Sequence, residues 1–178
     1  MTVFRYFADP HASTASTWTE TPRRCEICGE VRPGYEGPYY GREEVDFVCE
    51  ACLVSGRLAE RGLRTNEGDV GPAPERSDEL EYRTPSLVTW QDFAWPVHCS
   101  DFCRFEREVG RRELDELGDG DGETFFRAHL HQTLRDFDFG AEDLPARAPS
   151  SRTESNSPAV YLFRCVECGT PVLWWDID

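Results

Sequence analysis

Two cysteine pairs near the start of the chain constrain its fold more than any other feature. Cys25 and Cys28 form one C-x-x-C motif, and Cys49 and Cys52 form another after an interval of about twenty residues. A C-x-x-C turn brings two sulfurs to one side of a tight loop, and Zn²⁺ prefers four ligands in a tetrahedron. The spacing therefore predicts a four-cysteine zinc site, in a first zinc unit that spans about residues 25–52.

Four further cysteines predict a second site of the same kind. Two of them form a third C-x-x-C motif near the end of the chain, and two lie four positions apart near residue 100. Once the first site has taken its ligands, these are the cysteines that remain, so their pairing follows by elimination. We expect a second zinc unit built from about residues 98–105 and 160–176, with the ligands Cys99, Cys103, Cys165 and Cys168.

The choice of ligands near residue 100 depends on a predicted helix. Ser100 or Asp101 is a suitable N-cap, and residues four apart on a helix lie on one face. Cys99 and Cys103 could then both point at one ion. His98 is an alternative to Cys99, because adjacent residues rarely both ligate one metal, and the helix-face argument favours Cys99.

The cysteines are expected to hold metal rather than to form disulfides or carry redox chemistry. The N-terminus lacks the charged segment and apolar run of a secretory signal, which predicts a cytoplasmic protein with reduced thiols. A redox C-x-x-C would need a thioredoxin-like βαβ pattern, which the sequence does not show. Four-cysteine sites leave no open coordination position, so the two expected zinc ions are structural.

Length and charge limit the classes of function. At 178 residues, the chain fits one domain, or one domain with a small module. The formal net charge is −15, and all 19 basic residues are arginine. Such a charge disfavours binding to nucleic acid or anionic membranes and favours a basic protein partner, or simply solubility. The sequence contains no apolar run of about 18 residues, so no membrane span is predicted.

The remaining pattern predicts an α+β protein rich in irregular structure. Residues 160–164 and 172–175 are expected to be strands on either side of the last C-x-x-C motif, as in a zinc ribbon. Apolar residues at helical spacing predict one helix that begins near residue 100 and a second over 123–137. Residues 53–63 are expected to form one or two helical turns, and residues 64–79 a loop or linker.

Several stretches of the chain, in the same order, carry a resemblance to a known family. The closing stretch is the most specific of them. The chain resembles the CbrC family, bacterial proteins named for a colicin-tolerance phenotype, over most of its length. The resemblance implies a cytoplasmic, zinc-binding protein and no assigned activity. It rests on the first cysteine unit, Arg83-Thr84-Pro85, Trp90-Gln91, His98-Cys99 with Asp101 and Cys103, Tyr161–Gly169 and Asp176-Ile177-Asp178.

These observations favour a non-enzymatic, zinc-stabilised protein that acts through protein interaction. One alternative is an immunity-like protein whose acidic surface neutralises a basic nuclease toxin. A second alternative is an enzyme with structural zinc and a pocket lined by Trp90, Trp95, His98 and acidic residues. The sequence has no G-x-S-x-G, phosphate-binding glycine loop or H-E-x-x-H motif that would support a familiar catalytic class.

Overall fold

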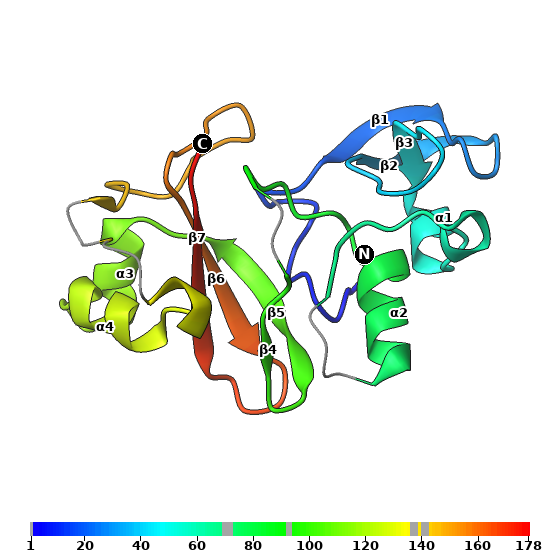
Figure 1. The fold of residues 1–178 in the computed structure, drawn as a ribbon. Coiled ribbons are helices and arrows are strands. Elements are labelled where there is room, and N and C mark those ends of the chain that lie inside the picture. Colours follow the sequence, from blue (N-terminus) through cyan, green and yellow to red (C-terminus); the bar gives the residue numbers. More distant parts are fainter. Residues whose placement is uncertain (1, 69–72, 92–93, 136–138, 140–142) are drawn as a thin grey trace.

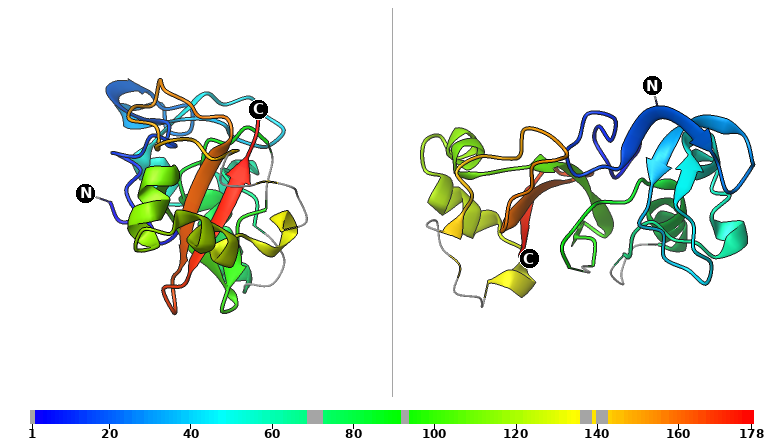
Figure 2. Two further views of the ribbon diagram at one scale, coloured as in Figure 1. Left: turned by 90° about the vertical axis from the view of Figure 1, so that its left-hand side faces the viewer. Right: turned by 90° about the horizontal axis from the view of Figure 1, so that it is seen from above.

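Two antiparallel sheets organise the chain, and each has two helices beside it (Figure 1). The computed structural model describes residues 2–68, 73–91, 94–135, 139 and 143–178. The three-stranded sheet lies with α1 and α2 at one end of the molecule. The four-stranded sheet lies with α3 and α4 at the other end, as two further views show (Figure 2). This arrangement confirms the predicted α+β class.

The first sheet presents the first cysteine unit. It has the order β1 (Trp18–Arg24), β2 (Val31–Glu36), β3 (Phe47–Cys49). Helix α1 (Glu50–Val54) begins immediately after β3, and Gly56, with φ +74°, follows its end. A 3₁₀ turn over Ala59–Arg61 comes next. The expected helical turns are therefore confirmed, and the first of them begins earlier than predicted.

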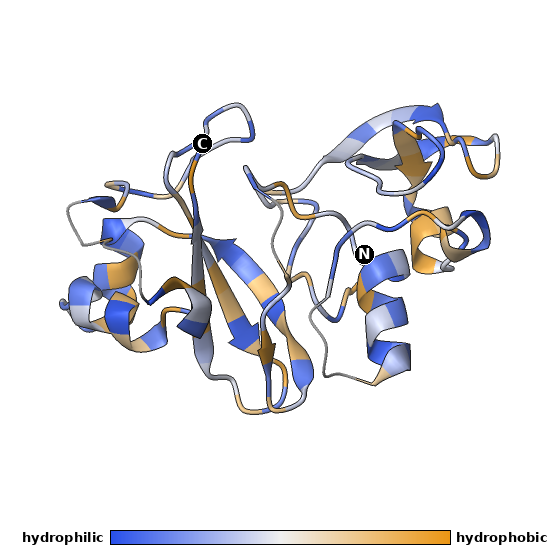
Figure 3. Ribbon diagram, in the orientation of Figure 1, coloured by the Kyte–Doolittle hydropathy of each residue, from blue (hydrophilic) through white to orange (hydrophobic). Residues whose placement is uncertain are grey.

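Helix α2 (Pro74–Arg83) lies in and beyond the stretch that we expected to be a loop. Pro74 occupies the first helical turn, where the missing N–H costs nothing. Leu80 is the buried residue of this helix, and the rest is mainly hydrophilic (Figure 3). A helix with one buried position has no apolar stripe, so periodicity did not reveal it. Part of the expected loop, residues 69–72, lies outside the described residues.

The second sheet contains the C-terminal hairpin at one edge. Its order is β4 (Val97–His98), β5 (Asp101–Glu108), β6 (Ala159–Cys165), β7 (Pro171–Asp176), and each neighbouring pair is antiparallel. Strands β6 and β7 flank the last C-x-x-C motif, so the predicted hairpin is confirmed. Apolar residues are concentrated on β6 (Figure 3), which is almost entirely buried.

The helix predicted from near residue 100 is wrong, because this stretch forms β5. Apolar Cys103 and Phe105 alternate there with polar Arg104 and Glu106, which is the period of a strand. A register shift between Phe105 and Arg107 then changes the spacing of the inward positions. Phe102 and Cys103 are both buried at the start of the strand, so Phe105 follows Phe102 at an interval of three, and the register shift lies within the interval of four to Val109. Together these intervals resembled a helix.

Two helices follow β5 and cover the outer part of the four-stranded sheet. Helix α3 spans Arg111–Leu117, and α4 spans Gly122–His129. The helix expected over 123–137 is therefore shorter, and its last two residues lie outside the described part of the chain. Helix α4 ends because the chain joins the sheet: Leu130 pairs with Leu173, and the N–H of His131 donates to the Leu173 carbonyl at 2.8 Å.

An extended N-terminal segment joins the two sheets. Phe7 pairs in parallel with Phe105 of β5, where β4 has already ended. Beside it, the buried Asp101 carboxylate accepts a hydrogen bond from Tyr6 at 2.8 Å and forms ion pairs with Arg5 and Arg76, each at 2.6 Å. One buried cluster includes residues of both sheets. Asp101 thus ties the N-terminal segment and α2 to the edge of the second sheet.

Replacing Asp101 with Asn is expected to destabilise the protein by about 2 kcal/mol. The variant removes the counter-charge of Arg76 and leaves Arg5 with the more distant Glu167, at 3.7 Å. Loss of an ion-pair partner costs about 3–5 kcal/mol when the pair is fully buried. The guanidinium groups here are about one-third exposed, so solvent reduces the cost. Urea denaturation of the metal-loaded protein would measure it. Glu20→Gln, on exposed β1, is the control, and equal midpoints for both variants would contradict the prediction.

Candidate metal centres

The first metal centre joins a turn to the start of a helix. Cys25 and Cys28 lie in the turn between β1 and β2, where the N–H of Gly29 donates to the Cys25 carbonyl at 2.8 Å. Gly29 has φ +77°, a conformation that glycine adopts without strain. Cys49 ends β3 and precedes α1, and Cys52 lies within that helix. The strand-to-helix change therefore gives the second C-x-x-C motif its tight turn.

The four sulfurs of this centre have the spacing of a tetrahedral site. All four lie within 4.8 Å of one another, and the sulfurs of Cys28 and Cys49 are 3.8 Å apart. Four sulfurs held about 2.3 Å from a central zinc would be about 3.8 Å apart. Three of the cysteines are buried, and Cys28 is half-buried. The donor set and its geometry fit a closed structural metal site.

Backbone N–H groups favour the thiolate form that a metal needs. Burial raises the pKa of the Cys25 thiol, but hydrogen bonds from the backbone of Cys49, Cys28 and Ile27 outweigh it, and the pKa falls to about 7. The N–H of Cys49 donates to the Cys25 sulfur at 3.3 Å. Because metal binding requires deprotonated ligands, this turn is prepared for it.

The second metal centre lies where two hairpin turns meet. One turn joins β4 to β5 and carries His98 and Cys99; the other joins β6 to β7 and carries Cys165 and Cys168. The latter turn repeats the geometry of the first centre. The N–H of Gly169 donates to the Cys165 carbonyl at 3.0 Å, and the φ of Gly169 is +74°.

The four donor atoms of the second centre also lie within 4.8 Å of one another. The sulfurs of Cys99 and Cys168 are 3.7 Å apart. The Nδ1 atom of His98 lies 3.2 Å from the Cys99 sulfur and 3.4 Å from the Cys168 sulfur. Three thiolates and one imidazole form a known zinc-binding set. The predicted set differs from this group at one position, since His98 takes the place of Cys103.

The strand explains why Cys103 lies outside this group. Without a helix, Cys99 and Cys103 do not share a helical face, and Cys103 points into the core of the sheet. Its side chain is fully buried, and burial raises the pKa of the thiol to about 12. At the turn, Cys99 and Ser100 have φ values of +50° and +61°. The sharp turn brings adjacent His98 and Cys99 to one point, contrary to the expectation that only one of them would take part.

The two centres differ in exposure to solvent. Cys99 and Cys168 are exposed in the second centre, whereas three of the four cysteines in the first are buried. The Thr170 hydroxyl lies 3.1 Å from the Cys168 sulfur and, with the Thr170 N–H, lowers the pKa of this thiol to about 6. The second centre is therefore the one that a chelator can reach directly.

The pocket suggested for an enzyme is not assembled as expected. Trp95 is buried and lines a cavity that Glu67 also lines. Trp90, by contrast, is about half exposed, and its ring N–H donates to the Asn156 carbonyl. His98 lies at the second metal centre. These three residues therefore occupy three different environments in the described part of the chain.

Comparison with known proteins places the chain in a family. A model described as "Uncharacterised protein family (UPF0167)" matches residues 1–177. The chain belongs to the UPF0167 family. It is 32% identical over 174 residues to a UPF0167 protein of Pseudomonas aeruginosa, a match that covers 93% of this chain and 91% of that protein. A UPF0167 protein of Mycobacterium bovis is 28% identical over 180 residues, which cover 97% and 91% of the two chains.

The family match supports an uncharacterised family, and the printed names of the relatives assign no activity. They also do not carry the CbrC name or the colicin link. No solved structure matches the chain. Within the described residues, no helix combines the length and apolar composition that a membrane span requires.

Substitutions should distinguish His98 from Cys103 as the fourth ligand of the second centre. We expect the wild-type protein, purified under reducing conditions, to contain two metal ions. His98→Ala should lose metal from the second centre, and Cys103→Ala should keep both ions. Elemental mass spectrometry would give the stoichiometry. Spectra of the Co²⁺-substituted protein would report the number of thiolate ligands. If only Cys103→Ala lost one full ion, the ligand set predicted from the sequence, with Cys103 in place of His98, would be correct.

Partial chelation should empty the second centre first. Its two exposed thiolates give a chelator direct access, whereas the first centre must open locally before release. We expect the metal released by a limiting amount of EDTA to come from the second centre, leaving one ion bound. Cys165→Ser should lack this fast phase, and Cys103→Ala should retain it. Equal release rates from both centres would contradict the exposure argument.

Proposed function

We propose that this protein is a non-enzymatic, zinc-stabilised interaction protein of the bacterial cytoplasm, with a basic protein partner. The observation that supports this most directly is the pair of four-donor groups. A zinc ion that takes all four donors has no open position for water or substrate, so its contribution is to folding. The acidic composition, with 34 acidic and 19 basic residues, then determines what the surface attracts.

A groove beside α2 offers the best surface for such a partner. Its volume is ≈ 480 Å³, and it runs between the N-terminal segment and α2. Glu75, Asp78 and Glu79 line it, together with the exposed apolar side chains of Val3 and Val54. Arg5 also reaches it, but this side chain is paired with Asp101. Arg83 also lines the groove, so the three carboxylates leave only a small excess of negative charge. This excess and the apolar rim suit a basic segment that carries apolar residues.

An immunity-like role is a specific form of this proposal. The CbrC resemblance implies a link to toxin tolerance, and a nuclease toxin would present a basic surface that fits the charge of −15. An enzyme with structural zinc is the alternative from another class. It predicts turnover that a single non-cysteine substitution abolishes, whereas the interaction protein predicts binding that neutralisation of the groove weakens.

The test is binding to a basic colicin nuclease domain and to unrelated basic proteins of similar charge. We expect binding that weakens steeply with salt, as it should for charge-dominated contacts. The triple variant Glu75→Gln, Asp78→Asn, Glu79→Gln should reduce the association rate by about tenfold or more. A variant with the exposed residues changed elsewhere, Glu20→Gln and Glu116→Gln, is the control.

Selective binding to the nuclease would support the immunity-like form, and binding to all basic proteins alike would leave only the general one. If the groove variant and the control bind equally well, the groove is not the contact surface. If no basic protein binds at low salt, the proposed partner class is wrong.

A further inference from the structure

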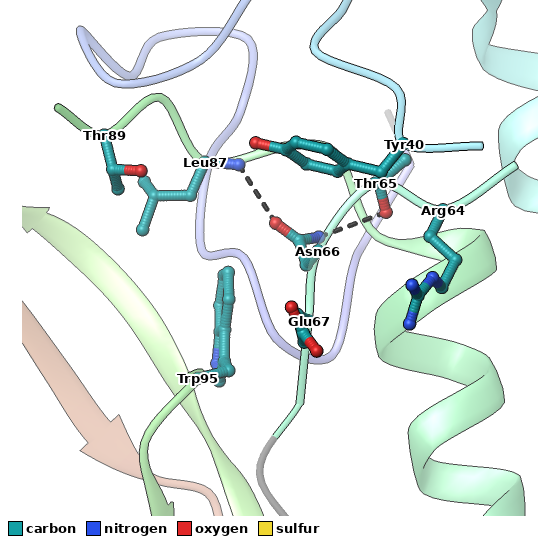
Figure 4. A pocket seen from close by; sticks show the side chains of 8 residues that line it. All are labelled: Tyr40, Arg64, Thr65, Asn66, Glu67, Leu87, Thr89 and Trp95. Carbon is teal, nitrogen blue, oxygen red and sulfur yellow. Dashed lines mark hydrogen bonds between the residues drawn. The ribbon is translucent and has the colours of Figure 1, made fainter. Parts of the chain in front are cut away.

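A small cavity lies where the loop before β3 meets the segment that leads into the second sheet. Its volume is ≈ 140 Å³. Figure 4 shows Tyr40 on one side, Trp95 and Leu87 on another, and Asn66 with Glu67 between them. This volume is below the range of about 300–1,000 Å³ that holds drug-sized ligands. The cavity therefore suits a molecule of only a few heavy atoms.

The hydrogen bonds of a buried asparagine side chain fix one wall of this cavity. Asn66 is buried, and its Oδ1 atom accepts the N–H of Leu87 at 3.1 Å (Figure 4). Its amide nitrogen lies within hydrogen-bond distance of the carbonyls of Leu80, Thr84 and Pro85. These contacts hold the chain before and after α2 together, so this wall exists without a ligand.

Backbone hydrogen bonds attach the two aromatic residues of the cavity, Tyr40 and Trp95, to the segment that contains Asn66. Tyr40 and Arg64 exchange both backbone hydrogen bonds at 2.8 Å. The N–H of Trp95 donates to the Glu67 carbonyl at 2.9 Å, and its ring N–H donates to the Cys103 carbonyl at 2.7 Å. The cavity is thus framed by three chain segments with fixed register, which is the preorganisation that a small-ligand site needs.

The cavity brings together charges of opposite sign. Arg64 and Glu67 both line it, and within the described residues neither forms an ion pair. Glu81 of α2 lies near both groups: burial raises the pKa of its carboxyl, nearby Arg64 partly offsets that rise, and the charges of Asp78 and Glu67 add to it. A ligand that carried a single charge would meet one favourable and one unfavourable group. A ligand with both charges would satisfy both.

We propose that this cavity binds a free α-amino acid, with its ammonium group at Glu67 and its carboxylate at Arg64. Guanidinium and carboxylate are the ordinary partners of these two groups. Tyr40, Trp95 and Leu87, which also line the cavity, then surround an apolar side chain of the ligand. Aromatic faces also favour a nearby ammonium group through cation–π attraction. The site is independent of both metal centres and of the proposed partner groove.

Titration of the metal-loaded protein with each standard L-amino acid, by calorimetry and thermal shift, tests the proposal. We expect saturable binding of one or a few small apolar amino acids, because the cavity of ≈ 140 Å³ holds only a few heavy atoms. Glu67→Gln and Arg64→Gln should each weaken binding by about tenfold or more, since each removes a charged hydrogen-bond partner. Glu20→Gln removes one exposed carboxylate elsewhere and should bind as the wild type does. Metal content and circular dichroism would show that each variant is folded.

Ligand analogues test the same proposal on the unaltered protein. The methyl ester and the N-acetyl derivative of the best amino acid each lack one charge, so both should bind at least about tenfold more weakly. If either analogue binds as well as the parent, the zwitterion assignment is wrong. If no amino acid binds saturably at millimolar concentration, or if neither cavity variant changes the affinity, the proposal fails.

Discussion

The convergence of cysteine-bearing turns into two four-donor groups is the constraint on which the rest of this structure depends. Each centre joins two turns that are separated in the sequence, and a zinc ion bound there would contribute about 10–16 kcal/mol when the site forms. That exceeds or equals the typical net stability of about 5–15 kcal/mol for a whole domain. The strands that lead into the centres are short, three residues in β3 and two in β4. Such strands have little independent stability. A bound metal ion would therefore fix the register that the strands alone would leave open.

The second centre lies beside an ionic cluster, whereas two of the helices pack elsewhere, among apolar residues. Strand β5 begins two residues after Cys99, and its first residue is the buried Asp101 that holds Arg5 and Arg76. The candidate metal ligand Cys99 is thus separated by a single residue from Asp101, which forms the ion pairs with both arginines. The helices α3 and α4, by contrast, pack on a separate apolar cluster against β6 and β7. They depend on ordinary burial rather than on the metal.

Some of this could be predicted from sequence, and the reason for each failure is physical. The C-x-x-C spacings have one simple explanation in a reducing compartment, so the first centre and the closing hairpin were found. The position of Cys103 relative to the second centre was not, because it depended on whether residues 101–108 form a helix or a strand. The irregular register near Phe105 gave helical spacing to a strand. Helix α2 buries only Leu80 and gave no signal. The cavity at Asn66 unites segments whose meeting no local pattern indicates.

The position of Asp101 has a consequence for how distant surfaces communicate. Its partner Arg76 belongs to α2, the helix whose acidic face lines the groove, while the residues just before it hold the exposed metal centre. A change in the turn at His98 and Cys99 would act two residues from the carboxylate that pairs with Arg76 of α2. Occupancy of the groove and occupancy of the second centre would then share one coupling free energy. By thermodynamic reciprocity, a partner that tightens metal retention must itself bind more strongly when the metal is present.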